Sequence, residues 1–132
     1  MAQPAAKEGD QIKGIDMHVV MVPSGPSLVP TPLPHPFSGP LRGKLSGDVR
    51  IGGKAAATAG STARNTPPHT PASPGISFQK PPGNQGTIQA GSPTVRINGK
   101  AAARAGDPVT TCNDPADLPA GQVIAGGTVR IG

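Results

Sequence analysis

The feature that most constrains this chain is an internal repeat. Residues 49–61 read VRIGGKAAATAGS, and residues 95–107 read VRINGKAAARAGD. A third copy begins with VRIG at residues 129–132. The copies are unevenly spaced, which argues against a regular solenoid. We therefore expect one hairpin-like unit that occurs three times, over residues of about 46–60, 91–106 and 126–132.

Each unit carries the signals of a two-stranded hairpin. The Val-Arg-Ile run alternates apolar and basic residues, as a half-buried strand does. Asn98-Gly99 and Gly52-Gly53 are typical of two-residue hairpin turns, in which both central residues need positive φ. We expect the Ala run to return as a strand, with a short helix as the alternative. The third copy stops at Gly132, so its first strand has to pair with another segment.

The composition leaves little material for a core. Leu, Ile, Val and Phe make up under a fifth of the 132 residues, while 19 Gly and 18 Pro exceed a quarter. That profile is typical of disordered chains, although the net charge of +5 is modest. The single Cys112 excludes an internal disulfide, which leaves a metal or a partner to stabilise the fold. We expect one domain over residues 14–132 after a flexible tail of residues 1–13.

An isolated two-stranded hairpin is marginal in water, so the three units need a shared core. The alternative is that duplication produced independent surface hairpins. The apolar residues of the three Val-Arg-Ile runs are the candidates for the shared core: Val49, Ile51, Val95, Ile97, Val129 and Ile131.

Two proline-rich segments separate the units and their flanks. Residues 22–40 hold seven prolines and cannot be helical, and residues 65–75 are similar. We expect both to be extended, polyproline-like loops that converge at a point.

Four residues are candidate metal ligands, and all lie outside the repeat units: His18, His35, His69 and Cys112. Three imidazoles and a thiolate complete a tetrahedral zinc site. The alternative for each is a solvated histidine or a small buried cysteine. A structural zinc supplies on the order of 10 kcal/mol of apparent folding free energy, enough to order a chain this poor in core.

No stretch approaches the ~18 apolar residues that span a bilayer, and the N-terminal residues lack the apolar region of a signal peptide. We expect synthesis in the bacterial cytoplasm and export without such a signal.

The repeats resemble those of a known family. SPTVRINGKAAARAGD (92–107), with SGDVRIGGKAAATAG (46–60) and IAGGTVRIG (124–132), is similar to the PAAR-repeat proteins. These are spike-tip proteins of type VI secretion and related extracellular contractile injection systems. The likeness runs from about Gly14 onward. The namesake Pro-Ala-Ala-Arg falls on residues 101–104, where Ala replaces Pro, and the first copy at 55–58 departs at both Pro and Arg.

The resemblance implies an all-β cone of three repeats with pseudo-threefold symmetry and a zinc-pinned tip. His18, His35, His69 and Cys112 would hold one structural zinc. The base would sit on a trimeric VgrG-like β-helical spike, with one copy per trimer, effectors as further partners, and transient piercing of a target membrane without a stable anchor. The residues that would contact the spike are Val49, Ile51, Val95, Ile97, Val129, Ile131, Arg50, Arg96 and Arg130.

Two other functions are weaker candidates. A catalytic zinc needs an open position and a nearby base, yet Glu8 is the only glutamate and no phosphate loop is present, so we expect no enzyme. The pI near 10.0 favours nucleic acid, but the basic residues are scattered and aromatic platforms are lacking. A small zinc protein with nucleic-acid binding or hydrolytic activity is the alternative function.

Overall fold

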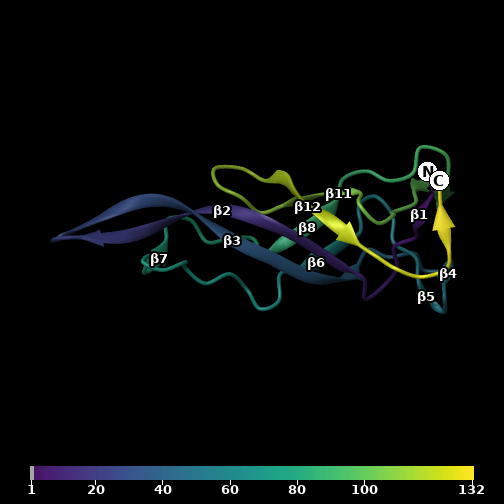
Figure 1. Ribbon diagram of the computed structural model, residues 1–132, viewed down its shortest axis with the longest axis horizontal. Helices are drawn as coiled ribbons and strands as arrows, with labels where there is room; N and C mark the ends of the chain where they lie inside the picture. Colours follow the sequence, from purple (N-terminus) through teal and green to yellow (C-terminus); the bar gives the residue numbers. More distant parts are fainter. Residues whose placement is uncertain (1) are drawn as a thin grey trace.

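The protein is an elongated all-β molecule, described here from a computed structural model over residues 2–132 (Figure 1). Within that range there is no helix, and so none that could cross a membrane. The all-β prediction is confirmed. The strands are β1 (Gln3–Pro4), β2 (Gln11–Ser24), β3 (Ser27–Gly43), β4 (Arg50–Ile51), β5 (Lys54–Ala55), β6 (Thr62–Arg64), β7 (Ser77–Phe78), β8 (Gln85–Ile88), β9 (Arg96–Ile97), β10 (Lys100–Ala101), β11 (Pro108–Thr111), β12 (Leu118–Ile124) and β13 (Arg130–Ile131).

A long hairpin of β2 and β3 projects from the body, and both chain ends lie at the opposite end of the molecule (Figure 1). Its register runs from Gln11 opposite Pro40 to Ser24 opposite Ser27. The expectation that residues 22–40 form a converging loop is therefore wrong, although their extended conformation is confirmed. A strand tolerates prolines where their missing N–H would point away from its partner strand, as the alternate prolines of β3 do.

The hairpin belongs to a seven-stranded sheet with the order β12-β11-β8-β6-β3-β2-β7. Because β12 also pairs with β2, six of these strands close on themselves. Alternate side chains of each strand point inward, which concentrates the few large apolar residues in one place. That core contains Ile12, Phe37, Leu41, Ile88, Val109 and Val123.

The repeat units form short hairpins, as predicted. They lie at the end of the molecule that carries both chain ends, which we call the base (Figure 1). β4 pairs with β5, and β9 pairs with β10, in antiparallel register. Asn98 and Gly99 have φ of 54° and 79°, and Gly52 and Gly53 have 57° and 82°, which is the double positive φ that the turn requires. Each Ala run begins in a return strand, β5 or β10, and no part of either run is helical, so the helical alternative is wrong.

The N-terminus supplies the third return strand. β13 pairs with β1, where Gln3 lies opposite Ile131 and Pro4 opposite Arg130. Residues 3–10, QPAAKEGD, correspond to KAAATAGS at 54–61 and KAAARAGD at 100–107. The expected flexible tail of residues 1–13 is thus incorrect for its described part, because β1 and the start of β2 are both paired.

The three units are joined by a ring of backbone hydrogen bonds. Ala6 N–H donates to Ala103 O (2.9 Å), Ala103 N–H to Ala57 O (3.1 Å), and Ala57 N–H to Ala6 O (3.1 Å). All three side chains are fully buried. A side chain as small as Ala lets the three segments that follow β1, β5 and β10 approach this closely.

The predicted shared core is present in part. Ile97 and Ile131 are buried beside Ala5, Ala56 and Ala102, with Val49 and Ile51 packed against them. Val95 and Val129 are 37% and 45% exposed, so they lie at the edge of this cluster. The alternative of independent surface hairpins is excluded, because all three units contribute to one cluster.

Candidate metal centre

A cluster of buried polar side chains lies between the body and the long hairpin. Asp16 and His18 project inward from β2 because residues of one strand that are two apart share a face. His35 comes from β3, directly opposite Asp16 in the register. His69 lies in the segment after β6, and Cys112 follows β11. Two paired strands and two connections therefore meet at one point, so the expectation that the ligands come from loops holds for His69 and Cys112 and is wrong for His18 and His35.

The candidate ligand atoms of Asp16, His18, His69 and Cys112 all lie within 4.8 Å of one another. Cys112 Sγ is 3.6 Å from His18 Nε2 and 3.4 Å from Asp16 Oδ2. Ligand atoms on a tetrahedral zinc are about 3.3–3.8 Å apart, given bonds of 2.0–2.3 Å. The cluster can hold a metal ion, and its nitrogen and sulfur donors are those that zinc prefers.

The three imidazole rings also fit a common ion. Their centroids are 5.0 Å apart for His18 and His69, and 5.5 Å apart for each of these with His35. A zinc bonded through Nε2 lies about 3.2 Å from the ring centre, so tetrahedral rings are about 5 Å apart.

His35 differs from the other two because both of its nitrogens meet backbone groups. Nδ1 is 2.8 Å from Leu33 O, which makes it the protonated nitrogen, and Nε2 accepts from Ala72 N–H at 3.0 Å. Burial lowers the pKa of His35 and keeps the ring neutral. This is the tautomer of a metal ligand, with Nε2 free of a proton. To bind an ion, however, Nε2 has to exchange Ala72 for the metal.

Asp16 is the polar centre of the cluster and was missed by the sequence reasoning. Its Oδ2 accepts from His69 Nε2 at 2.8 Å and faces the Cys112 thiol. Its Oδ1 accepts from the Thr111 hydroxyl at 2.5 Å and from Asn113 Nδ2 at 3.4 Å. A fully buried carboxylate requires this number of donors. The signal available in the sequence was its position two residues before His18, on the same strand face.

The neighbours of His18 and His69 set the protons. Asn65 Oδ1 accepts from Ser38 N–H, so its Nδ2 faces Nδ1 of His69 at 3.0 Å. His69 therefore carries its proton on Nε2 and donates it to Asp16. His18 Nδ1 is buried without a hydrogen-bond partner, with Asp114 Oδ2 3.4 Å away. A carboxylate behind a ligand imidazole is the usual second partner of a metal-bound histidine.

Cys112 is a neutral thiol in the metal-free protein. Burial, together with the neighbouring Asp16 carboxylate, raises its pKa to about 11. Because a metal binds the thiolate, binding has to release this proton, and the proton on His69 Nε2 has to move as well.

The predicted partner-binding arginines are the first residues of β4, β9 and β13, one in each of the three base hairpins. All three are exposed, and each guanidinium faces a carbonyl close to its own hairpin. Arg50 Nη1 is 3.1 Å from Gly53 O, Arg96 Nη1 is 3.3 Å from Gly99 O, and Arg130 Nη1 is 3.5 Å from Ala2 O. The three arginines are thus equivalent in structure as well as in sequence.

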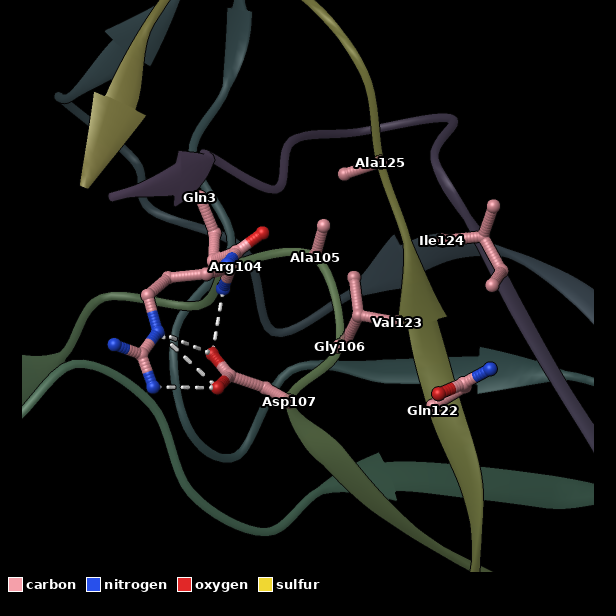
Figure 2. A pocket seen from close by; sticks show the side chains of 9 residues that line it. All are labelled: Gln3, Arg104, Ala105, Gly106, Asp107, Gln122, Val123, Ile124 and Ala125. Atoms are coloured by element: carbon pink, nitrogen blue, oxygen red, sulfur yellow. Dashed lines mark hydrogen bonds and ion pairs between the residues drawn. The ribbon is translucent and has the colours of Figure 1, made fainter. Parts of the chain in front are cut away.

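A cavity of about 590 Å³ also opens near the base, and Figure 2 shows its lining. Its charged groups are Arg104 and Asp107, which pair with each other at 2.9 Å. The same turn recurs where Lys7 N–H donates to Asp10 Oδ2 and Thr58 N–H to Ser61 Oγ. The arginine of the second repeat therefore stabilises a turn, and among the described residues no metal-ligand cluster lines this cavity.

Comparison with known proteins identifies one family. Residues 79–132 match the family model of the PAAR motif. No curated protein and no solved structure matches the chain. The matched region includes the second repeat, Cys112 and β13, whereas β1, which completes the last hairpin, lies outside it.

Proposed function

The chain is a PAAR-repeat protein, and from this premise we propose that it is a spike-tip protein that caps a trimeric VgrG-like β-helical spike of a contractile injection system. The PAAR motif supports a role associated with the spike of such systems. The family is structural, which favours a mechanical part over an enzyme. Export would follow from incorporation into the particle.

The base of the molecule supports the capping proposal. It presents three short hairpins that are joined in a ring by Ala6, Ala57 and Ala103. A single chain with three equivalent contacts can cover the end of a homotrimer, with one repeat meeting each subunit. The exposed edges of these hairpins offer main-chain groups that can extend strands of the partner.

The spike would contact the base through apolar and basic groups together. The proposed contact residues are Val49, Ile51, Val95, Ile97, Val129, Ile131, Arg50, Arg96 and Arg130. Val95 and Val129 keep enough exposed surface to pack on a partner, while the buried Ile97 and Ile131 would act by holding the hairpins in place. Effectors would be further partners of the same particle.

We also propose that one structural zinc joins the hairpin to the body through His18, His69 and Cys112, with His35 as the fourth ligand. His35 has the required tautomer and ring position. Asp16 already has donors from Thr111 and Asn113 that a metal would leave in place. Its charge would then balance the ion from the second coordination shell.

The decisive experiment is co-purification of the tagged full-length chain with candidate trimeric spike proteins, followed by mass measurement of the complex. We expect one copy of this chain per trimer. Three copies per trimer, or no complex with any candidate from the same system, would overturn the capping proposal. The contact residues are tested with a chain that carries Arg50→Glu, Arg96→Glu and Arg130→Glu. We expect this variant to lose the complex while it retains the fold.

A further inference from the structure

The long hairpin continues beyond the metal centre as an unusual projection. From the pair His18–Leu33, the register runs six more positions per strand, which is about 20 Å, to the turn between Ser24 and Ser27. β7 covers β2 only at Val20 and Met21. We call residues 22–29, past β7, the finger. In Figure 1 the finger is the pointed end of the molecule.

The finger and the adjoining part of the hairpin, residues 17–21 and 30–41, which we call the stem, contain no acidic residue, Lys or Arg. Residues 17–41 contain no Asp, Glu, Lys or Arg, in a chain with a net charge of +5. Leu28 and Val29 are 48% and 45% exposed, close to the turn. A projecting β-ribbon in water is usually protected from aggregation by charged residues, especially lysine. The finger lacks that protection and presents apolar side chains instead.

The finger and stem also lack most of the N–H groups that would point outward. On β2, the backbone N–H groups of odd-numbered residues point away from β3, since those of Met17 and Val19 donate to Asn113 and Asp114. The next unpaired outward position is Pro23. On β3, the backbone N–H groups of even-numbered residues point outward, as that of Ser38 does when it donates to Asn65.

The outward even-numbered positions of β3 are mostly proline: Pro30, Pro32, Pro34 and Pro36. Within the finger, Leu28 is the outward residue of β3 that keeps its N–H. An unpaired N–H is costly in an apolar phase, and proline removes that cost without breaking the ribbon. The outward carbonyls remain, and they require the polar boundary of a bilayer rather than its centre.

We propose that the finger inserts into the boundary between headgroups and acyl chains of a lipid bilayer, through Val22, Leu28, Val29 and the turn. The absence of charge and the loss of outward donors are separate properties, and both suit a neutral lipid phase. This inference deepens the membrane-piercing part of the proposed function and rests on it only for its biological setting. It gives the tip an affinity for lipid, whereas simple piercing requires none.

The test is flotation of the full-length, metal-loaded chain with phosphatidylcholine vesicles, which carry no net charge. We expect the wild type to float in low and in high salt. Leu28→Asp combined with Val29→Asp should lower the bound fraction about tenfold or more, because charged side chains partition poorly into lipid. The matched control is Leu118→Asp with Ile124→Asp, which changes two apolar residues of similar exposure on β12 and should leave flotation unchanged.

A second readout uses the absence of Trp from the chain. Leu28→Trp should show a blue-shifted emission with vesicles, and Ile124→Trp should not. The inference is overturned if the wild type does not float, if flotation requires anionic lipid and disappears in salt, or if the control pair loses it equally. The Leu28→Asp/Val29→Asp chain should still bind the spike, so a failure of lipid binding and a failure of capping are separate results.

Discussion

The backbone N–H of Ala6 donates a 2.9 Å hydrogen bond to the carbonyl of Ala103, and this contact joins the N-terminal strand to the second repeat. Ala57 completes the ring, and the side chains of all three are fully buried. The ring is the point at which the three repeats become one body, and it depends on the absence of any side chain larger than a methyl group.

Ala103→Leu should therefore destabilise the protein by about 1–3 kcal/mol or more, because the added methylene groups have no space. Urea unfolding, measured on the metal-loaded chain, tests this directly. Ala90→Leu is the control, since Ala90 is exposed and its replacement should change the free energy of unfolding by less than about 0.5 kcal/mol. Equal effects at the two sites would contradict a packed ring.

Removal of residues 2–9 should lower the melting temperature by more than about 10 °C or prevent folding. The deletion leaves β13 without its partner β1 and opens the alanine ring at Ala6. Thermal unfolding by circular dichroism measures the change. Ala2→Ser, outside β1, should have no effect. A deleted chain that melts like the wild type would restore the flexible tail expected from sequence.

Zinc content and coordination test the metal centre. Cys112→Ser should lose zinc and melt at a lower temperature, because it removes the one sulfur donor. X-ray absorption of the zinc-loaded wild type should show one sulfur and three imidazoles, and His35→Gln should remove one imidazole. The same imidazole count in both proteins would place Asp16, rather than His35, in the fourth position.

Chelation tests the same site without substitution. Removal of zinc under native conditions should loosen the segments around His69 and Cys112, seen as faster amide exchange there, while the alanine ring stays protected. An unchanged exchange pattern would show that Asp16 and its hydrogen bonds hold these segments without an ion.

The pH dependence of one inter-repeat contact has a defined sign. Asn98 Nδ2 donates to Asp48 Oδ1 at 2.8 Å, and this bond, with a smaller contribution from Ser46, lowers the pKa of Asp48. The folded carboxylate is favoured, so its contribution to stability is full above the unfolded pKa of about 3.9 and disappears as the pH falls through the lower folded value.

Asn98→Gly removes the donor and keeps positive φ at the turn, as Gly52 does in the first repeat. The pKa of Asp48, measured by NMR titration, should then rise toward its ordinary range, with the smaller contribution of Ser46 remaining. The stability difference between the two proteins should vanish at a pH below both values. A difference that persists there would come from the turn itself.

The sequence alone determined the local structure of this protein. Alternation in Val-Arg-Ile and the Asn98-Gly99 turn are properties of neighbouring residues, so the base hairpins could be predicted. Seven prolines excluded a helix over residues 22–40. His69 follows the first repeat and Cys112 follows the second, so a common site for both was expected because the repeats themselves had to meet.

Only the tertiary structure decided which distant segments pair. Residues 3–10 match the other return strands, but the match became evident only when β1 lay against β13. Asp16 lies in the metal centre because it shares the inward face of β2 with His18. The proline-rich segment is a strand because it pairs with β2 along its length. Strand pairing depends on backbone groups that every residue carries, so side-chain patterns identify strands without identifying their partners.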